Sequence, residues 1–150
     1  VTNEDYVGSL VQFANGAQGS LEVCRVANGP RCEMAFELNA TQGAVRWNYE
    51  RMNELQLFLP DGTDEHDGPV LIQVGPAHPA YASFYPGRAN SMSYEDLKAI
   101  EALRFLESIV RKKQGEPGFA QELDVAAVQD AMARSWTSER WENVELLSAD

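Results

Sequence analysis

The stretch YVGSLVQFANGAQGSLEVCRV, residues 6–26, decides how the chain begins to fold. It holds two strand-like runs, Tyr6–Ala14 and Ala17–Val26, joined by the dipeptide Asn15-Gly16. Asn-Gly between such runs is typical of a β-hairpin with a two-residue type I′ turn, because both central residues of that turn need φ > 0. The sequence therefore predicts that the chain opens as antiparallel sheet.

The two-residue turn also predicts which side chains of the hairpin share a face. We expect one face to carry Leu10, Leu21 and Val23. The other face is expected to carry Val7, Val11, Phe13 and Cys24. Since both faces are then partly apolar, the pattern favours a partner or a second subunit packed against one of them.

Downstream of the hairpin, four more runs predict strands and two periodic segments predict helices. The strand-like runs cover residues 32–40, 44–49, 55–59 and 70–74. A capping-box-like pair, Ser93 and Asp96, begins a first helix, a second begins near Gln121, and residues 141–146 are expected to return to the sheet. This order predicts an α+β fold: an open, mainly antiparallel sheet of about six to seven strands with two helices packed on one face. We expect residues 1–150 to form one domain.

Composition limits the classes of function. Of the 150 residues, 44% are hydrophobic and 23% charged, and the net charge is -11. Such acidity disfavours binding to nucleic acid or to anionic membranes, and no apolar run approaches the ~20 residues of a membrane span. We expect a soluble, cytoplasmic protein with Cys24 and Cys32 reduced. Because the chain begins at Val1 and all four methionines are internal, we also expect a piece of a longer polypeptide.

Motifs for nucleotide, metal or nucleophile chemistry do not occur in the sequence. It has no G-x-G-x-x-G, P-loop, C-x-x-C, H-E-x-x-H or nucleophile elbow. The acidic stretch 61–67 could hold a hard cation, but its spacing does not fit an EF-hand and a solvated hairpin tip explains it better. We therefore predict no catalytic residue, no cofactor-binding residue and no metal ligand in this chain.

The segment from Gly75 to Met92 is the best candidate for a binding site. It interrupts the strand pattern with prolines and aromatic rings, and rings offer stacking surface to a sugar while polar side chains offer hydrogen bonds. The alternative is that the rings only pin a long loop to the sheet. Arg25, at the end of the second predicted strand, either points into a cleft or faces solvent. The predicted substrate-binding residues are Arg25, His78, Tyr81, Tyr85, Arg88 and Tyr94.

Several short motifs, taken in order, resemble one known family. They are residues 13–19, Glu22–Arg25, Phe36–Leu38 before Gly43, Tyr49–Leu55, Gly75–Pro79, Phe84–Gly87, Tyr94–Asp96, Glu101 with Phe105-Leu106, and Val128–Ser135 before Trp141. In order and spacing they resemble the C-terminal domain of the glucose-fructose oxidoreductase and inositol dehydrogenase family (Gfo/Idh/MocA), particularly members that act on sugars and cyclic polyols. The resemblance covers almost the whole chain.

The resemblance implies an N-terminal Rossmann domain of the same polypeptide, which would bind NAD or NADP. It also implies a C-terminal open antiparallel sheet with helices on one face and, commonly, a subunit interface on the other. The family's catalytic Glu-Lys-Pro and G-x-H-x-x-D segments do not occur here, and His78, followed by Pro79 and Ala80, does not fit the second. By resemblance, this chain contributes substrate contacts and a homo-oligomer surface, binds no cofactor alone and is inactive alone.

The sequence thus favours the substrate-binding and oligomerisation domain of an NAD(P)-dependent sugar or polyol oxidoreductase. Two alternatives remain open at this point. One is a stand-alone, non-catalytic binding or assembly domain with the same fold. The other is a carbohydrate hydrolase that uses two carboxylates, which would turn over glycosides without a cofactor.

Overall fold

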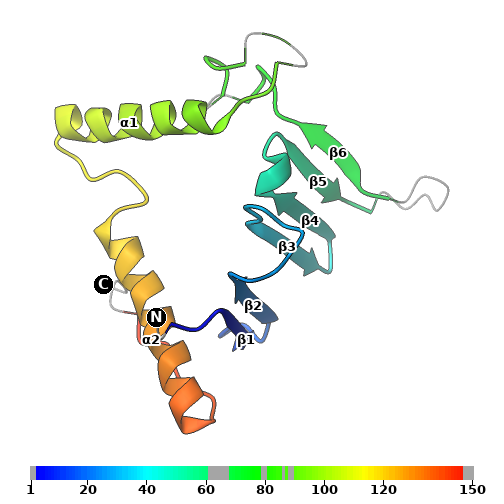
Figure 1. Cartoon of the computed structure of the whole chain (residues 1–150). Coiled ribbons are helices and arrows are strands. Elements are labelled where there is room, and N and C mark those ends of the chain that lie inside the picture. Colours follow the sequence, from blue (N-terminus) through cyan, green and yellow to red (C-terminus); the bar gives the residue numbers. More distant parts are fainter. Residues whose placement is uncertain (1–2, 61–67, 79–80, 86, 88–89, 147–150) are drawn as a thin grey trace. The chain divides into compact units, whose positions relative to one another are not determined.

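The α+β prediction is confirmed by the structure, a computed structural model that describes residues 3–60, 68–78, 81–85, 87 and 90–146. The described part contains six strands, one short 3₁₀ helix and two α-helices (Figure 1). In chain order they are β1 (Tyr6–Gln12), β2 (Gln18–Cys24), β3 (Ala35–Ala40), β4 (Gly43–Asn48), η1 (Tyr49–Arg51), β5 (Glu54–Phe58), β6 (Val70–Gln73), α1 (Tyr94–Arg111) and α2 (Phe119–Ser138).

Contacts divide the chain into two compact units. One comprises residues 1–26 and 100–150, and the other comprises residues 27–99. The strands form two hydrogen-bonded sheets, β1-β2 in the first unit and β3-β4-β5-β6 in the second. The six predicted strands are therefore all present, but they pair as two antiparallel sheets where the sequence led us to expect one.

The loop between β1 and β2 has three residues, not two. The amide of Gly16 donates to the carbonyl oxygen of Phe13 at 2.9 Å, and the amide of Phe13 donates to the carbonyl oxygen of Ala17 at 2.9 Å. Gly16 has φ +87°, whereas Asn15 keeps a negative φ and accepts a hydrogen bond from the Ala17 amide through Oδ1. This is a turn closed by a left-handed glycine, so the predicted type I′ turn is wrong.

The longer loop shifts the pairing register by one residue. Val7 lies opposite Val23, and Leu10 lies opposite Ser20. One face of the hairpin therefore carries Val7, Val11, Leu21 and Val23, and the other carries Tyr6, Leu10 and Cys24. The predicted grouping of Leu10 with Leu21 and Val23 is wrong, because a slip of one residue exchanges the two faces of a strand.

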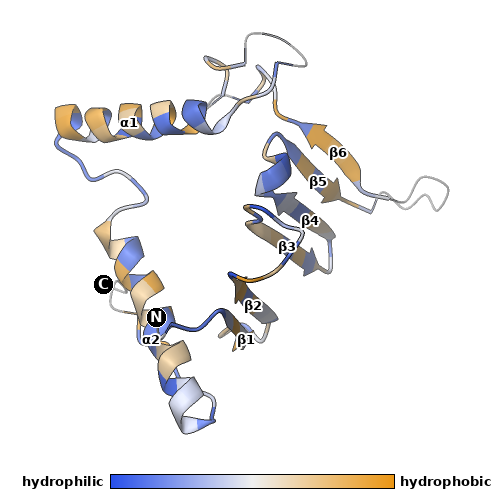
Figure 2. Cartoon of the chain, viewed as in Figure 1, coloured by the Kyte–Doolittle hydropathy of each residue, from blue (hydrophilic) through white to orange (hydrophobic). Residues whose placement is uncertain are grey.

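The four-stranded sheet has one apolar and one polar face. Trp47 lies opposite Phe36, and Leu57 lies opposite both Val45 and Val70. Since side chains alternate along each strand, the apolar face carries Phe36, Leu38, Val45, Trp47, Leu55, Leu57, Val70 and Ile72. Hydrophobic residues follow one another along β6 (Figure 2). The alternation of side chains along β3, β4 and β5 thus decides what each face can contact, whereas β6 also places Leu71 on the polar face.

Gly43 allows the β3-β4 hairpin to approach β5 closely. It has φ +151°, and a Cβ built on it would lie 2.4 Å from the carbonyl oxygen of Phe58. That oxygen belongs to the backbone of a neighbouring strand and has little room to move. A side chain at this position would therefore strain both the turn and the pairing of β4 with β5.

Glu50, in η1, fixes the segment that leads into β3. Its Oε1 atom accepts hydrogen bonds from the backbone amides of Arg31, at 2.6 Å, and Cys32, at 2.9 Å. These bonds, the one from Cys32 first, lower the pKa of the Glu50 carboxyl below its usual value of 4.5. The amide of Tyr49 also donates to the Met34 carbonyl at 2.8 Å, so the segment and η1 are joined by three hydrogen bonds.

Both helices begin close to where the sequence places them. At the start of α1, the Ser93 amide donates to Asp96 Oδ2 at 2.9 Å, as the capping-box pattern predicts. At the start of α2, the Gly118 amide donates to Gln121 Oε1 at 2.8 Å. Neither helix of the described residues combines the length and the apolar character that a bilayer span requires.

Residues 141–146 do not form the predicted seventh strand. Side chains of α2 bind this segment instead: Arg134 Nη1 donates to Glu142 Oε2 at 2.8 Å, and Arg134 Nη2 donates to the Asn143 carbonyl at 2.9 Å. Ser138 Oγ also donates to Glu142 Oε1 at 2.7 Å. The prediction is wrong because the segment is bound by side chains of the preceding helix and makes no strand ladder.

We predict that Gly43→Ala lowers the free energy of unfolding by about 2 kcal/mol or more, because the new Cβ meets a backbone oxygen in a strained conformation. Guanidinium chloride unfolding of the chain measures the effect. Gly19→Ala is the matched control, since its Cβ would meet only a Phe13 ring carbon at 3.6 Å. Equal stability of both variants would contradict this account of the β3-β4 turn.

We predict that the hydrogen bonds of Glu50 are lost in acid. The folded-state pKa lies below the unfolded value of 4.5, so the stabilisation is complete above that value and disappears as the pH falls through the folded-state pKa. The amide shifts of Arg31 and Cys32, followed by NMR, should titrate together with a midpoint below 4.5. In Glu50→Gln this titration should vanish, and a midpoint at or above 4.5 would refute the arrangement.

Candidate functional site

The segment after β6 is ordered by a series of turns. The amide of His78 donates to the Gly75 carbonyl, that of Tyr81 to the His78 carbonyl, and that of Phe84 to the Tyr81 carbonyl, each at 2.9 Å. Each bond joins residues three apart, which is the pattern of β-turns. The predicted site loop is therefore a chain of turns in its described part, and these turns position its aromatic and polar side chains.

Asn53, just before β5, ties the far end of this loop to the four-stranded sheet. Its Nδ2 donates to the Met92 carbonyl at 2.9 Å, and its Oδ1 accepts from the Met92 amide at 2.9 Å. The Asn53 carbonyl also accepts from the Val74 amide at 2.9 Å, where the loop begins. One residue thus holds both ends of the segment 75–91, although the sequence analysis did not identify it.

Two side chains of the loop region are buried against the same unit. Tyr85 and Met92 are each only 5% exposed. Tyr85 is one of the predicted substrate-binding residues, but a side chain this buried leaves a ligand little surface to contact. This placement supports the alternative that part of the aromatic set pins the loop.

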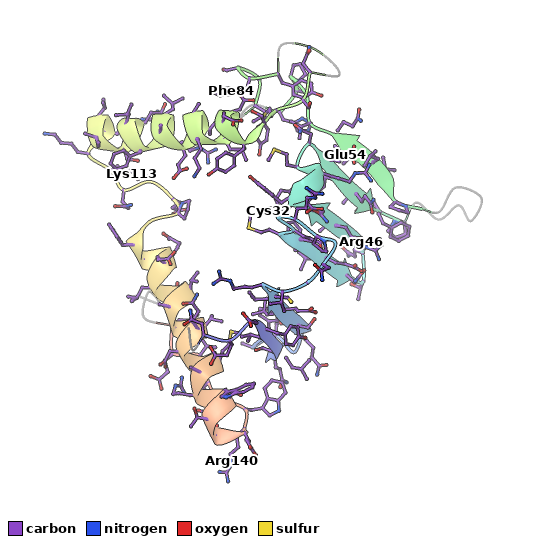
Figure 3. All side chains as sticks on the ribbon, in the orientation of Figure 1. Cys32, Arg46, Glu54, Phe84, Lys113 and Arg140 are labelled. Carbon is purple, nitrogen blue, oxygen red and sulfur yellow. The ribbon has the colours of Figure 1, made fainter. Side chains whose placement is uncertain are left out.

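The other predicted residues differ in accessibility. His78 and Tyr81 are half-buried. Tyr94 is 55% exposed, and the Lys98 ammonium nitrogen lies 5.5 Å from the centre of its ring, within cation-π range. Phe84, from the same loop, is labelled in Figure 3. His78, Tyr81, Tyr85 and Tyr94 all belong to the unit of residues 27–99.

Two further predicted site residues, Arg25 and Arg88, stay predictions. Arg25 is exposed and belongs to the other compact unit, where its amide donates to the Asp5 carbonyl at 2.8 Å. Arg88 lies outside the described residues. The acidic stretch 61–67 lies outside them too, and the described part of the chain has no cluster of three or more His, Cys, Asp or Glu that could hold a metal ion.

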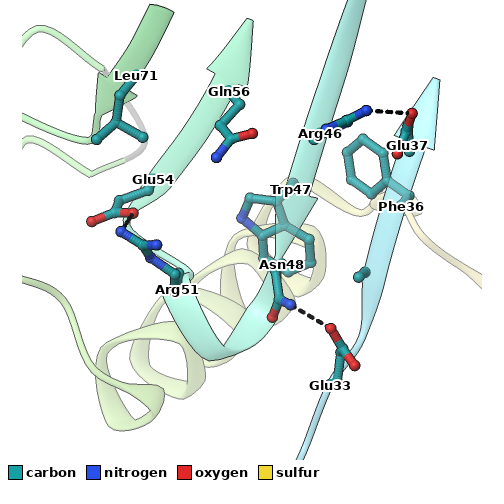
Figure 4. A pocket seen from close by; sticks show the side chains of 11 residues that line it. Glu33, Phe36, Glu37, Arg46, Trp47, Asn48, Arg51, Glu54, Gln56 and Leu71 are labelled. Carbon is teal, nitrogen blue, oxygen red and sulfur yellow. Dashed lines mark hydrogen bonds and ion pairs between the residues drawn. The ribbon is translucent and has the colours of Figure 1, made fainter. Parts of the chain in front are cut away.

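A second feature, on the polar face of the four-stranded sheet, was not predicted as a site. It is an open hollow of about 530 Å³, and Figure 4 shows its side chains. Arg46 pairs with Glu37 at 2.9 Å, and Arg51 pairs with Glu54 at 2.6 Å. Arg46 and Glu54 are labelled on neighbouring strands in Figure 3. Four charged residues of the hollow are therefore already paired, and Phe36, Trp47 and Leu71 add apolar surface to its lining.

The electrostatics of the hollow do not suit acid catalysis by Glu37. Hydrogen bonds from Asn39 first, and then from Arg46, lower the pKa of the Glu37 carboxyl. A glycosidase needs one carboxylic acid whose pKa is raised, so that it is protonated near neutral pH. The lowered pKa of Glu37 therefore disfavours Glu37 as that acid.

With the geometry established, comparisons with known proteins show where the same fold occurs. No family model matches the chain. Levoglucosan dehydrogenase of Pseudarthrobacter phenanthrenivorans is 36% identical over 146 residues, which are 97% of this chain and 37% of that protein. The solved complex of a levoglucosan dehydrogenase with NADH and levoglucosan has a TM-score of 0.92 at 35% identity, over 98% of this chain and 40% of that one. An oxidoreductase domain protein from Kribbella flavida gives a TM-score of 0.89 at 29% identity, over 97% of this chain and 38% of that one.

The chain is thus homologous, over nearly its full length, to dehydrogenases and oxidoreductase domain proteins. It matches their C-terminal part and spans about two fifths of the length of these relatives. The fold expected from the family resemblance is the fold that the comparison finds.

We predict that Asn53→Ala loosens the loop, because it removes both hydrogen bonds to Met92 and leaves two part-buried backbone groups unpaired. The free energy of unfolding should fall by about 1–3 kcal/mol, and the Met92 amide should exchange faster with deuterium. Asn39→Ala, which removes one exposed hydrogen bond to Glu37, is the control. Unchanged exchange at Met92 in Asn53→Ala would show that the clamp does not hold the loop.

Proposed function

We propose that the chain is the substrate-binding part of an NAD-dependent oxidoreductase that acts on a sugar or cyclic polyol. The observation that carries the proposal is the match to levoglucosan dehydrogenase, at 36% identity over 97% of this chain and at a TM-score of 0.92 to its complex with NADH and levoglucosan. Another solved structure of that enzyme, bound to NADH and L-sorbose, has a TM-score of 0.93 at 36% identity. NADH in both complexes favours NAD over NADP.

In this proposal the chain binds and orients the sugar, and the hydride transfer depends on a nucleotide-binding half of the same polypeptide. His78, Tyr81 and Tyr94 are the described residues that we assign to the substrate side of the loop. Arg25 and Arg88 remain proposed contacts from the sequence. Tyr85 is assigned to anchoring the loop, because it is only 5% exposed. Sugar rings present an apolar face for aromatic side chains and hydroxyl groups for polar ones.

We also propose that larger surfaces of the sheets are covered in the complete protein. On the apolar face of the four-stranded sheet, Phe36 is 47% exposed, Leu38 61% and Val70 63%. Contiguous apolar surface of this kind marks an interaction site. The nucleotide-binding half and further copies of the same protein are the partners we propose, with the open sheet face as the oligomer surface.

A stand-alone binding domain is the second candidate, and one experiment separates the two. We predict that the isolated chain 1–150 shows no NADH binding by titration calorimetry up to millimolar concentration. We predict that the complete polypeptide binds NADH and reduces NAD in the presence of a sugar such as levoglucosan. The same sample, by light scattering, should have the mass of an oligomer.

Each result of this experiment favours a different candidate function. Tight NADH binding by the 150-residue chain would refute the proposal that NADH binds to another part of the polypeptide. Absence of NAD-linked sugar oxidation by the complete polypeptide would favour the stand-alone binding domain. Release of reducing sugar from a glycoside without any cofactor would instead support the hydrolase alternative. A monomeric mass would contradict only the proposed oligomer surface.

A further inference from the structure

His78 has one hydrogen-bonding group without a partner in the described structure. Its amide donates to the Gly75 carbonyl and its carbonyl accepts from the Tyr81 amide, both at 2.9 Å. Its Nδ1 lies 3.0 Å from the Gly75 amide nitrogen. Nε2 alone has no partner among the described residues, although the side chain is half-buried. A half-buried polar group needs water or a ligand.

The backbone determines which ring nitrogen carries the proton. The Gly75 N–H always bears a hydrogen and points at Nδ1, so Nδ1 must present its lone pair to accept it. The Gly75 carbonyl oxygen, 3.2 Å from the same nitrogen, would be the acceptor for the other tautomer, but that tautomer would set two hydrogens against each other at the Gly75 amide. In the neutral ring the proton is therefore on Nε2.

We propose that His78 is a positioning residue whose Nε2–H donates a hydrogen bond to a hydroxyl or ring oxygen of the sugar, and that the Gly75 amide holds the ring in the required tautomer. This inference rests on the proposed function of the loop and specifies the role of one residue in it. The direction of this N–H donor is set by a tight turn, and a single directed donor suits the hydroxyl and ring oxygens of a sugar.

Two substitutions separate the two nitrogens. In His78→Asn, the amide oxygen can replace Nδ1 and keep the turn, but no donor remains at the position of Nε2. In His78→Gln, the amide nitrogen can replace the Nε2 donor, but the acceptor for Gly75 is lost. We expect the two variants to differ in opposite ways. His78→Asn should keep its stability and lose substrate affinity, whereas His78→Gln should lose stability and keep more of its substrate affinity.

The experiment uses the complete polypeptide, NAD and levoglucosan as the probe. We expect KM to rise about 3- to 10-fold in His78→Asn with little change in kcat, as the loss of one neutral hydrogen bond predicts. KM should rise less in His78→Gln, although its unfolding midpoint falls. Ala77→Ser, on the same turn, is the control. A KM in His78→Asn equal to that of the unsubstituted protein would overturn the proposal and leave His78 as a turn residue.

A spectroscopic measurement keeps this inference separate from the proposed function. The ¹⁵N spectrum of His78 in the complete polypeptide, recorded without substrate, reports the tautomer, and we expect the proton on Nε2. A proton on Nδ1 would overturn the inference whatever the activity. If the unsubstituted complete protein oxidises no sugar at all, the proposed function fails, and the assignment of a sugar to His78 fails with it.

Discussion

The hydrogen bonds of Asn53 are the constraint on which the unit of residues 27–99 depends. Three bonds of 2.9 Å join this residue to the start and the end of the loop that follows β6. Without them, ordering this long connection, which contains several prolines, would lose conformational entropy with few contacts to compensate for the loss. With them, Met92 is buried and α1 begins directly afterwards at Tyr94. The sheet thereby provides a rigid base for a loop that carries the proposed substrate contacts.

In several places in this chain, polar side chains form hydrogen bonds to backbone groups of connecting segments. Glu50 binds the amides of Arg31 and Cys32 before β3, and Arg134 binds the Asn143 carbonyl after α2. Such contacts hold connections in place where the hydrophobic core is small: among the described residues, the buried hydrophobic side chains are Tyr85, Met92 and Ala131. The remaining apolar surface is consistent with a part of a larger enzyme, as we propose, since relatives are more than twice as long.

Local patterns in the sequence were enough to predict the six strands, the two helices and the α+β class. The register of the first hairpin was not predictable in this way, because Asn15-Gly16 fits both a two-residue turn and a three-residue loop, and only the φ of Asn15 decides between them. The predicted seventh strand does not form, because Arg134 lies nearby in the sequence and binds residues 142 and 143. Asn53 could not be found, since its partner Met92 lies 39 residues further along the chain. Among the described residues, four of the predicted site residues belong to one unit, but only the structure separates Tyr85, which is buried, from Tyr94, which is exposed.

We propose that the loop between β6 and α1 contacts the sugar while the dinucleotide binds elsewhere in the complete polypeptide. Hydrogen-deuterium exchange of that polypeptide, with NADH alone and with NADH plus levoglucosan, tests it most directly. We predict that peptides from residues 75–92 gain protection only when the sugar is added. Protection of these peptides by NADH alone, or sugar-dependent protection confined to other parts of the protein, would contradict it.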